Sequence, residues 1–303
     1  MRGPARRPPM AAGWAGGRRL RGAAHPLDNG PPAKPPLMQA EPRAKMTTLL
    51  ILMPTGGQID TPAVHSLLGL TQALPRHGIP FALKTYEWSD LVISRNYLMS
   101  VFLADRKFTH ALLLDSDMSY QPQVFFDLLA FDADFTCAPY PQRRMQWAAF
   151  RALVEREASK PEAERLPTDT LLAESFRYNV PQVFDAGQPW PYEARDGFRK
   201  VPGAGTGFIL LRRAVPERMV EAGVAKPVPG FNGPGYPGAD FHDFFSHLRG
   251  RGGQVMHGED TSFCRRWIEG CGGEIWCHES AKITHHGDLA YPGDYALAPK
   301  PRG

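Results

Sequence analysis

The sequence predicts an α/β fold, with a mostly parallel sheet flanked by helices, as a single domain with a disordered N-terminal tail. Short apolar runs typical of buried strands recur through residues 46–295. Segments with apolar residues at helical spacing separate these runs. Such alternation is typical of a parallel sheet, because each helix carries the chain back to the start of the next strand.

The first half of the domain shows this alternation most clearly. Thr61 and Pro62 mark the start of one helix, since threonine is a good N-cap and proline fits the first helical turn. Gly78 is a natural stop for the same helix. Strands are predicted at residues 49–53, 79–86, 111–114 and 135–138, and helices at 61–78, 94–106 and 124–129.

The second half is more polar, and its pattern is weaker, above all over residues 151–200. Glycines end the last predicted helix, because glycine disfavours helix interiors. The expected elements are a charged helix around 151–165, strands at 208–211 and 274–277, a glycine-rich loop at 230–238 and a helix at 259–269.

Residues 1–45 differ from the rest of the chain. They hold nine of the 30 prolines and show no apolar periodicity, so we predict that they are disordered. An organelle transit segment or an over-extended gene start would also explain an arginine-rich stretch before Met46. At the other end, residues 296–303 are expected to form a flexible C-terminus.

Charge and composition narrow the possible functions. The tail has nine basic and two acidic residues, a net charge of +7, so the remaining residues carry −3 when the whole chain carries +4. A slightly acidic domain argues against nucleic-acid binding, which needs a clustered basic surface. No apolar run approaches the roughly 20 residues that span a bilayer.

The four cysteines are too few for the disulfide scaffold of a small secreted domain. Reduced thiols and a cytoplasmic location are therefore predicted. A zinc site built from Cys264, Cys271, Cys277 and His278 is disfavoured, because their spacing matches no common zinc pattern.

Asp115-Ser116-Asp117 directly follows the predicted strand at 111–114. Ligands of open parallel sheets bind beyond the carboxyl ends of the strands, and carboxylates there can hold Mg²⁺ or Mn²⁺. The alternative is a solvated acidic turn. A second pair, Asp132 and Asp134, precedes a strand, so we expect it at the opposite edge of the sheet, in a structural loop.

Two later segments also carry chemistry. Glu259 and Asp260 open the helix at 259–269, where acidic residues either cap the helix or supply a general base. His285 and His286 follow the last predicted strand and are either surface residues or metal ligands.

The order of these motifs resembles that of a nucleotide-sugar-dependent glycosyltransferase of the GT-A fold, similar to the large family 2 group. The resemblance covers roughly residues 47–290, with 150–200 unmatched in detail. The motifs that carry it are Pro54-Thr55, Ser94-Arg95-Asn96, Leu112–Asp117, Gly203–Phe208, Gly258-Glu259-Asp260 and His285-His286-Gly287.

The resemblance implies a nucleotide-sugar donor, a Mn²⁺ or Mg²⁺ cofactor, and a sugar, lipid-linked or protein acceptor. It also implies residue roles, written here as expectations. Pro54 and Thr55 border the nucleotide, Arg95 lies near the base or diphosphate, Asp115 and Asp117 hold the metal with His285, and Asp260, beside Glu259, deprotonates the acceptor.

One departure concerns the nucleotide. Family 2 enzymes often carry an Asp-Asp-Gly-Ser cluster after the second strand, where this chain has Lys84-Thr85-Tyr86-Glu87-Trp88. Glu87 is then a candidate ribose contact, and Tyr86 or Trp88 a candidate base-stacking residue. The carboxylate arrangement favours inversion, although a late metal-binding histidine also suits retaining enzymes.

Two other functions fit the same features. A nucleotidyltransferase also uses an α/β sheet and a carboxylate-bound metal, but Gly56-Gly57 lacks a neighbouring basic residue for phosphate. A catalytically silent sugar- or nucleotide-binding protein is the third possibility. The retained aspartates at 115, 117 and 260 argue against it.

Overall fold

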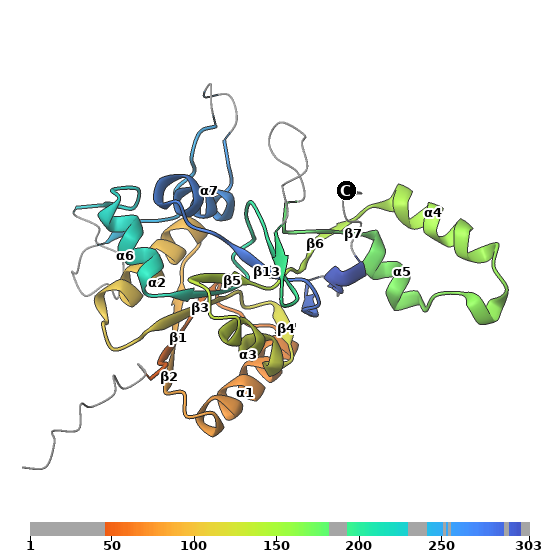
Figure 1. Cartoon of the computed structure of the whole chain (residues 1–303), viewed down its shortest axis with the longest axis horizontal. Helices are drawn as coiled ribbons and strands as arrows, with labels where there is room; N and C mark the ends of the chain where they lie inside the picture. Colours follow the sequence, from red (N-terminus) through yellow and green to blue (C-terminus); the bar gives the residue numbers. More distant parts are fainter. Residues whose placement is uncertain are drawn as a thin grey trace, which may run out of the picture. The chain divides into compact units, whose positions relative to one another are not determined.

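The computed structural model describes residues 46–181, 193–229, 241–250, 253, 256–287 and 291–297 (Figure 1). The predicted disordered tail, residues 1–45, lies outside the described residues. So do the expected loop at 230–238 and residues 298–303 of the expected flexible C-terminus. Just before that segment, Tyr295–Leu297 forms a 3₁₀ turn.

An eight-stranded sheet forms the centre of the fold, in the order β2-β1-β3-β10-β5-β13-β9-β8. Every strand predicted from the sequence is present, with ends that differ by at most two residues. The strands are β1 (Leu49–Thr55), β2 (Phe81–Glu87), β3 (His110–Leu114), β5 (Phe135–Cys137), β8 (Ala194–Arg195), β9 (Phe198–Lys200), β10 (Phe208–Arg212) and β13 (Trp276–His278).

The direction of β10 determines which loops meet. β1 is parallel to β2 and β3, and β5 is parallel to β13, but β10 lies antiparallel between β3 and β5. The amino end of β10 therefore meets the carboxyl ends of its neighbours. The loops that follow β1, β2, β3 and β5 and the loop that precedes β10 gather at one edge of the sheet.

Helices cover both faces of the sheet (Figure 1). β1, β3 and β10 are buried on both sides, so their residues alternate between two apolar cores. In β1, Leu50 and Leu52 belong to one core and Leu49 and Ile51 to the other. One core includes residues of α2 (Leu91–Ala104), α6 (Ala214–Glu221) and α7 (Glu259–Arg265), and the other includes residues of α1 (Thr61–Arg76) and α3 (Pro122–Ala130).

Some helix boundaries differ from the prediction. α2 begins three residues before Ser94 because the Asp90 carboxylate accepts a hydrogen bond from the Ile93 amide at 3.0 Å and caps the helix. The charged helix expected at 151–165 is α4 (Trp147–Ala158), followed after Pro161 by a 3₁₀ turn. Proline disfavours a continuous helix there.

Between β5 and β10 the chain forms a hairpin and two helices. β6 (Pro141–Met145) pairs with β7 (Phe176–Tyr178), and α4 packs beside α5 (Thr168–Ser175), as Figure 1 shows. A small sheet joins β4 (Met118–Tyr120), β14 (Ile283–His285) and β15 (Tyr291–Pro292). It brings the end of the domain back to the segment after β3.

The second aspartate pair lies where the sequence predicted. Arg212, at the carboxyl end of the reversed β10, forms ion pairs with Asp132 and Asp134. This end of β10 lies at the opposite edge from the loop after β3, so the predicted position of the pair is confirmed. No helix among the described residues is long and apolar enough to cross a membrane.

Candidate active site

Two pockets open at the edge of the sheet where the loops gather. The smaller has a volume of about 280 Å³, and the larger about 960 Å³. The smaller is lined by Pro54, Thr55, Gly56, Trp88, Ser89, Leu91, Ser94, Arg95, Asp115, Ser116 and Asp117. It brings together sequence-predicted residues from β1, α2 and the turn after β3. Asp260 and His285 line the larger pocket.

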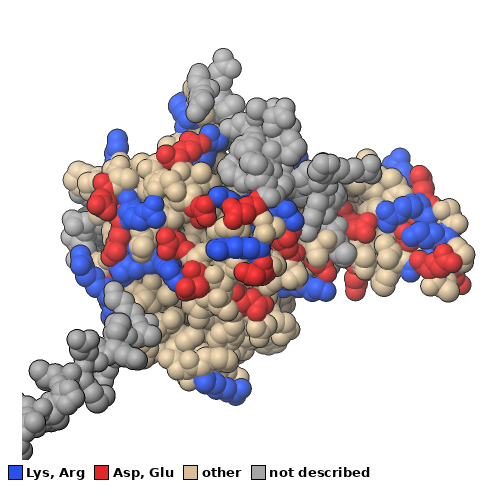
Figure 2. Space-filling model, in the orientation of Figure 1, with Lys and Arg blue, Asp and Glu red and all other residues tan. Residues whose placement is uncertain are grey.

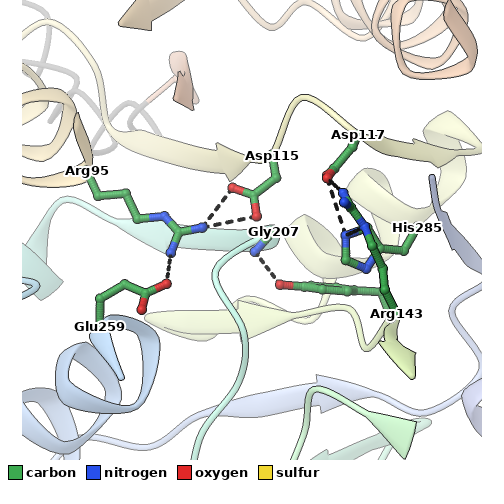
Figure 3. A network of polar contacts seen from close by, with 8 residues as sticks. Arg95, Asp115, Asp117, Arg143, Gly207, Glu259 and His285 are labelled. Carbon is green, nitrogen blue, oxygen red and sulfur yellow. Dashed lines mark hydrogen bonds and ion pairs between the residues drawn. The ribbon is translucent and has the colours of Figure 1, made fainter. Parts of the chain in front are cut away.

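Arg95, which lines the smaller pocket with Asp115, is buried and forms an ionic triad with two carboxylates (Figure 3). Its Nη2 donates to both carboxylate oxygens of Asp115, at 2.9 and 3.0 Å, and its Nη1 donates to Glu259 at 2.7 Å. Burial alone lowers the pKa of Arg95, but the charges of Asp115 and Glu259 outweigh this effect and raise it. Arg95 therefore stays charged and links the start of α2 to β3 and α7.

Asp260, unlike Glu259, forms no ion pair with the described residues. Its Oδ1 accepts a hydrogen bond from the Thr261 amide at 2.7 Å. Burial, followed by the charge of Glu259, raises the pKa of Asp260. A carboxylate that lines a large pocket with a raised pKa is a better proton acceptor than one held by arginine.

Asp117 and His285 meet where the two pockets adjoin (Figure 3). β4 and β14 pair His285 with Met118, which puts Asp117 Oδ2 3.4 Å from His285 Nε2. His285 Nδ1 lies 2.9 Å from the Pro141 carbonyl oxygen, to which it donates in the neutral ring. Burial lowers the pKa of His285, which favours that neutral form. Nε2 is then left with a lone pair.

The arginine Arg143 of β6 contacts both of these residues. Its Nε donates to His285 Nε2 at 3.0 Å, and its guanidinium pairs with Asp117 Oδ2. The other Asp117 oxygen, Oδ1, is buried and has no hydrogen-bond partner in the described part of the chain. The His286 amide donates to the Asp117 carbonyl oxygen at 2.8 Å, but its ring has a different partner, with Nε2 2.7 Å from the Ser119 hydroxyl.

The predicted ligand set is only partly assembled. Asp117 and His285 are together, whereas Asp115 is turned to Arg95. No group of three or more His, Cys, Asp or Glu side chains is arranged to hold a metal ion in the described part of the chain. All four cysteines carry free thiols.

The glycine-rich loop before β10 packs tightly against Tyr140. The Gly207 amide donates to the Tyr140 hydroxyl at 2.9 Å. A Cβ at Gly207 would lie 2.7 Å from the Tyr140 ring, and one at Gly205 2.5 Å from its hydroxyl. These two positions therefore need glycine for close approach.

Sequence reasoning missed Tyr140 and Arg143, which lie in the sequence between the Leu112–Asp117 and Gly203–Phe208 motifs. The only local signal was their place after a strand, at the carboxyl edge of the sheet. Two polar residues of β7 and the segment after it, Arg177 and Asn179, also line the larger pocket and were not predicted. On the face seen in Figure 2, acidic and basic side chains are interspersed and form no continuous basic patch.

No protein-family model and no curated protein matches the chain. Among solved structures, protein A197 from STIV is similar, with 17% identity and a TM-score of 0.42 over 82% of this chain and 95% of its own. A glycosyltransferase involved in glycosylation of the PBCV-1 major capsid has 15% identity and a TM-score of 0.24 over 30% of this chain. GalNAc-T7, solved with UDP, GalNAc and Mn²⁺, has 11% identity and a TM-score of 0.38 over 80% of this chain.

The matches cover 51% of the PBCV-1 enzyme and 44% of GalNAc-T7. The described part of the chain has a large, mostly parallel sheet between helices, as the sequence predicted.

Proposed function

We propose that this protein is a glycosyltransferase that moves a sugar from a nucleotide-sugar donor to an acceptor hydroxyl. One observation carries the proposal. Residues that the motif order assigned to the donor line the smaller pocket, and the assigned base, Asp260, lines the larger one. The two pockets adjoin at Asp117 and His285. A donor and an acceptor could therefore approach each other from opposite sides.

The smaller pocket suits a nucleotide. Trp88 follows β2 at its rim, is 39% exposed, and has its ring stacked on Tyr86 at a centroid distance of 6.3 Å. An aromatic face held in this way can stack on a base. Glu87 lies next to Gly57: a Cβ built on Gly57 would be 3.1 Å from Glu87 Oε1. Glu87 is thus beside the Pro54–Gly57 loop, as a ribose contact requires.

The Asp117–His285 pair fits a divalent ion. It offers Asp117 Oδ2, which lies 3.4 Å from an imidazole lone pair whose ring is fixed through the opposite nitrogen. Beside it, the buried oxygen Asp117 Oδ1 has no hydrogen-bond partner among the described residues. A nitrogen ligand favours Mn²⁺ over Mg²⁺. When bound, the ion would supply positive charge against the diphosphate leaving group. We assign Asp115, held by Arg95, to the donor rather than to the metal.

The larger pocket suits a carbohydrate acceptor. It combines amide side chains, Gln142, Gln146 and Asn179, with the guanidinium of Arg177. Amide and guanidinium groups can hydrogen-bond sugar hydroxyls. Asp260, in the same wall, is placed to take the proton of an acceptor hydroxyl. Attack from this side, opposite the donor, would invert the anomeric carbon.

The test is a thermal-shift panel of UDP-, GDP-, CMP- and TDP-sugars, each with and without Mn²⁺. The true donor should raise the melting temperature in a concentration-dependent way, by mass action. Asp117→Asn should lose the Mn²⁺-dependent part of the shift. Asp134→Asn is the matched control, because Asp134 belongs to the other aspartate pair at the opposite edge. No stabilisation by any nucleotide sugar, with or without Mn²⁺, would contradict the proposal.

A further inference from the structure

The guanidinium of Arg143 occupies the position that a cation would take between Asp117 and His285 (Figure 3). It uses the same two atoms that would ligate an ion, Asp117 Oδ2 and His285 Nε2. The Asp117 side chain is only 23% exposed, so its charge is partly desolvated and is stabilised by a nearby cation. With Arg143 in place, the charge of Asp117 is neutralised by the chain itself.

The position of Arg143 is accommodated by a glycine. A Cβ at Gly287 would lie 3.0, 3.1 and 3.3 Å from Cδ, Nε and Cζ of Arg143. These distances are tighter than ordinary van der Waals contact, so a larger residue at 287 would crowd the guanidinium. The absence of a side chain at Gly287 therefore leaves room for it beside His285.

Arg143 is also able to leave this position. Its side chain is 44% exposed, compared with 5% for Arg95 in the neighbouring triad. Arg143 lines the larger pocket, whose volume of about 960 Å³ gives a displaced side chain room to move. An ion pair between partly exposed groups is weak, typically less than about 1 kcal/mol. A divalent ion carries twice the charge and can compete for the same two ligands.

We propose that Arg143 is an internal cation that holds the Asp117–His285 site in the free enzyme and is displaced when a divalent metal binds. Arg143 and the metal thus exclude each other, and Arg143 lowers metal affinity until the donor arrives with its own phosphate oxygens. The displaced guanidinium remains in the wall of the acceptor pocket, where it is a positioning residue for the acceptor. This inference rests on the metal site of the proposed function.

The test is a titration of the protein with Mn²⁺ alone. The electron paramagnetic resonance signal of the free ion measures how much Mn²⁺ remains unbound. Arg143→Ala should bind Mn²⁺ about fivefold more tightly than wild type, because the competing ion pair is lost. Arg144→Ala is the matched control and should behave as wild type, since Arg144 is exposed on the same strand. The double variant Arg143→Ala/His285→Ala should not show this gain in Mn²⁺ affinity, because one of the two ligands is missing.

Equal or weaker Mn²⁺ binding by Arg143→Ala would overturn the inference, as would a gain that persists without His285. If Arg143→Ala does not fold, Arg143→Gln keeps a side chain of similar length without the charge and should show the same gain. The nucleotide-sugar panel separates the two proposals. If Arg143→Ala gains Mn²⁺ affinity but no nucleotide sugar binds, the displacement of Arg143 by the metal would be supported and the proposed glycosyl transfer would be contradicted.

Discussion

Arg95 Nη2 lies 2.9 Å from one oxygen of Asp115 and 3.0 Å from the other. Asp117, only two residues later, is paired with Arg143 instead. The two carboxylates of one short motif therefore face different arginines, one almost fully buried and one half-exposed. Asp115 is thus held at the smaller pocket by Arg95, whereas Asp117 keeps a buried oxygen that has no hydrogen-bond partner among the described residues.

We expect Arg95→Met to destabilise the fold by about 3–5 kcal/mol, because it leaves Asp115 and Glu259 without their shared partner. Urea unfolding measures the loss. Lys107→Met is the control, since Lys107 pairs with Asp105 at the surface, where an ion pair contributes less than about 1 kcal/mol. Equal effects of the two substitutions would show that the triad does not hold the edge of the sheet together.

Asp260→Asn is expected to abolish transfer while donor affinity stays near that of wild type. The amide keeps the shape of the carboxylate but cannot accept the proton. Because burial and Glu259 raise the pKa of Asp260, wild-type activity should decline as pH falls through that raised pKa, at a higher pH than for an ordinary carboxyl. The measurement is the pH dependence of kcat/KM. Retained transfer in Asp260→Asn would exclude Asp260 as the base.

Trp88→Ala should weaken nucleotide binding about tenfold, since stacking on a base contributes about 1–3 kcal/mol. Calorimetric titration with the nucleoside diphosphate measures this. Trp147→Ala is a matched control, because Trp147 is 69% exposed and lines neither pocket. A loss of similar size in both variants would point to a general effect on folding rather than to a base contact.

Much of the fold could be predicted because the buried strands are continuous apolar runs. Leu112, Leu113 and Leu114 identify β3 without any information from elsewhere in the chain. The local sequence of a strand does not indicate whether it runs parallel or antiparallel to its neighbours. The reversed β10 has the same apolar pattern as a parallel strand, so its direction was not predicted.

The site could be predicted in part for a similar reason. The strand-end position of Asp115 and the resemblance that put Thr55 beside the nucleotide both directed attention to this edge of the sheet, and both residues line the smaller pocket. Pairing between side chains depends on tertiary packing. Nothing near Arg143 in the sequence indicates that it reaches Asp117, 26 residues away, or His285, 142 residues away.

His285 is expected to be the metal ligand, and His286 is not. The two rings differ in their partners, since His285 Nε2 faces Asp117, whereas His286 Nε2 lies 2.7 Å from the Ser119 hydroxyl. His285→Ala should weaken Mn²⁺ binding about tenfold or more in the presence of the nucleoside diphosphate, because one of two protein ligands is lost.

His286→Ala is the matched control for this substitution and should bind Mn²⁺ as wild type does. Titration of Mn²⁺ into each variant measures the difference. Unchanged affinity in His285→Ala would mean that carboxylate and phosphate oxygens alone hold the ion. Weakening only in His286→Ala would exchange the roles of the two rings. It would also require that β14 shifts by one residue against β4, which would break the pairing of His285 with Met118.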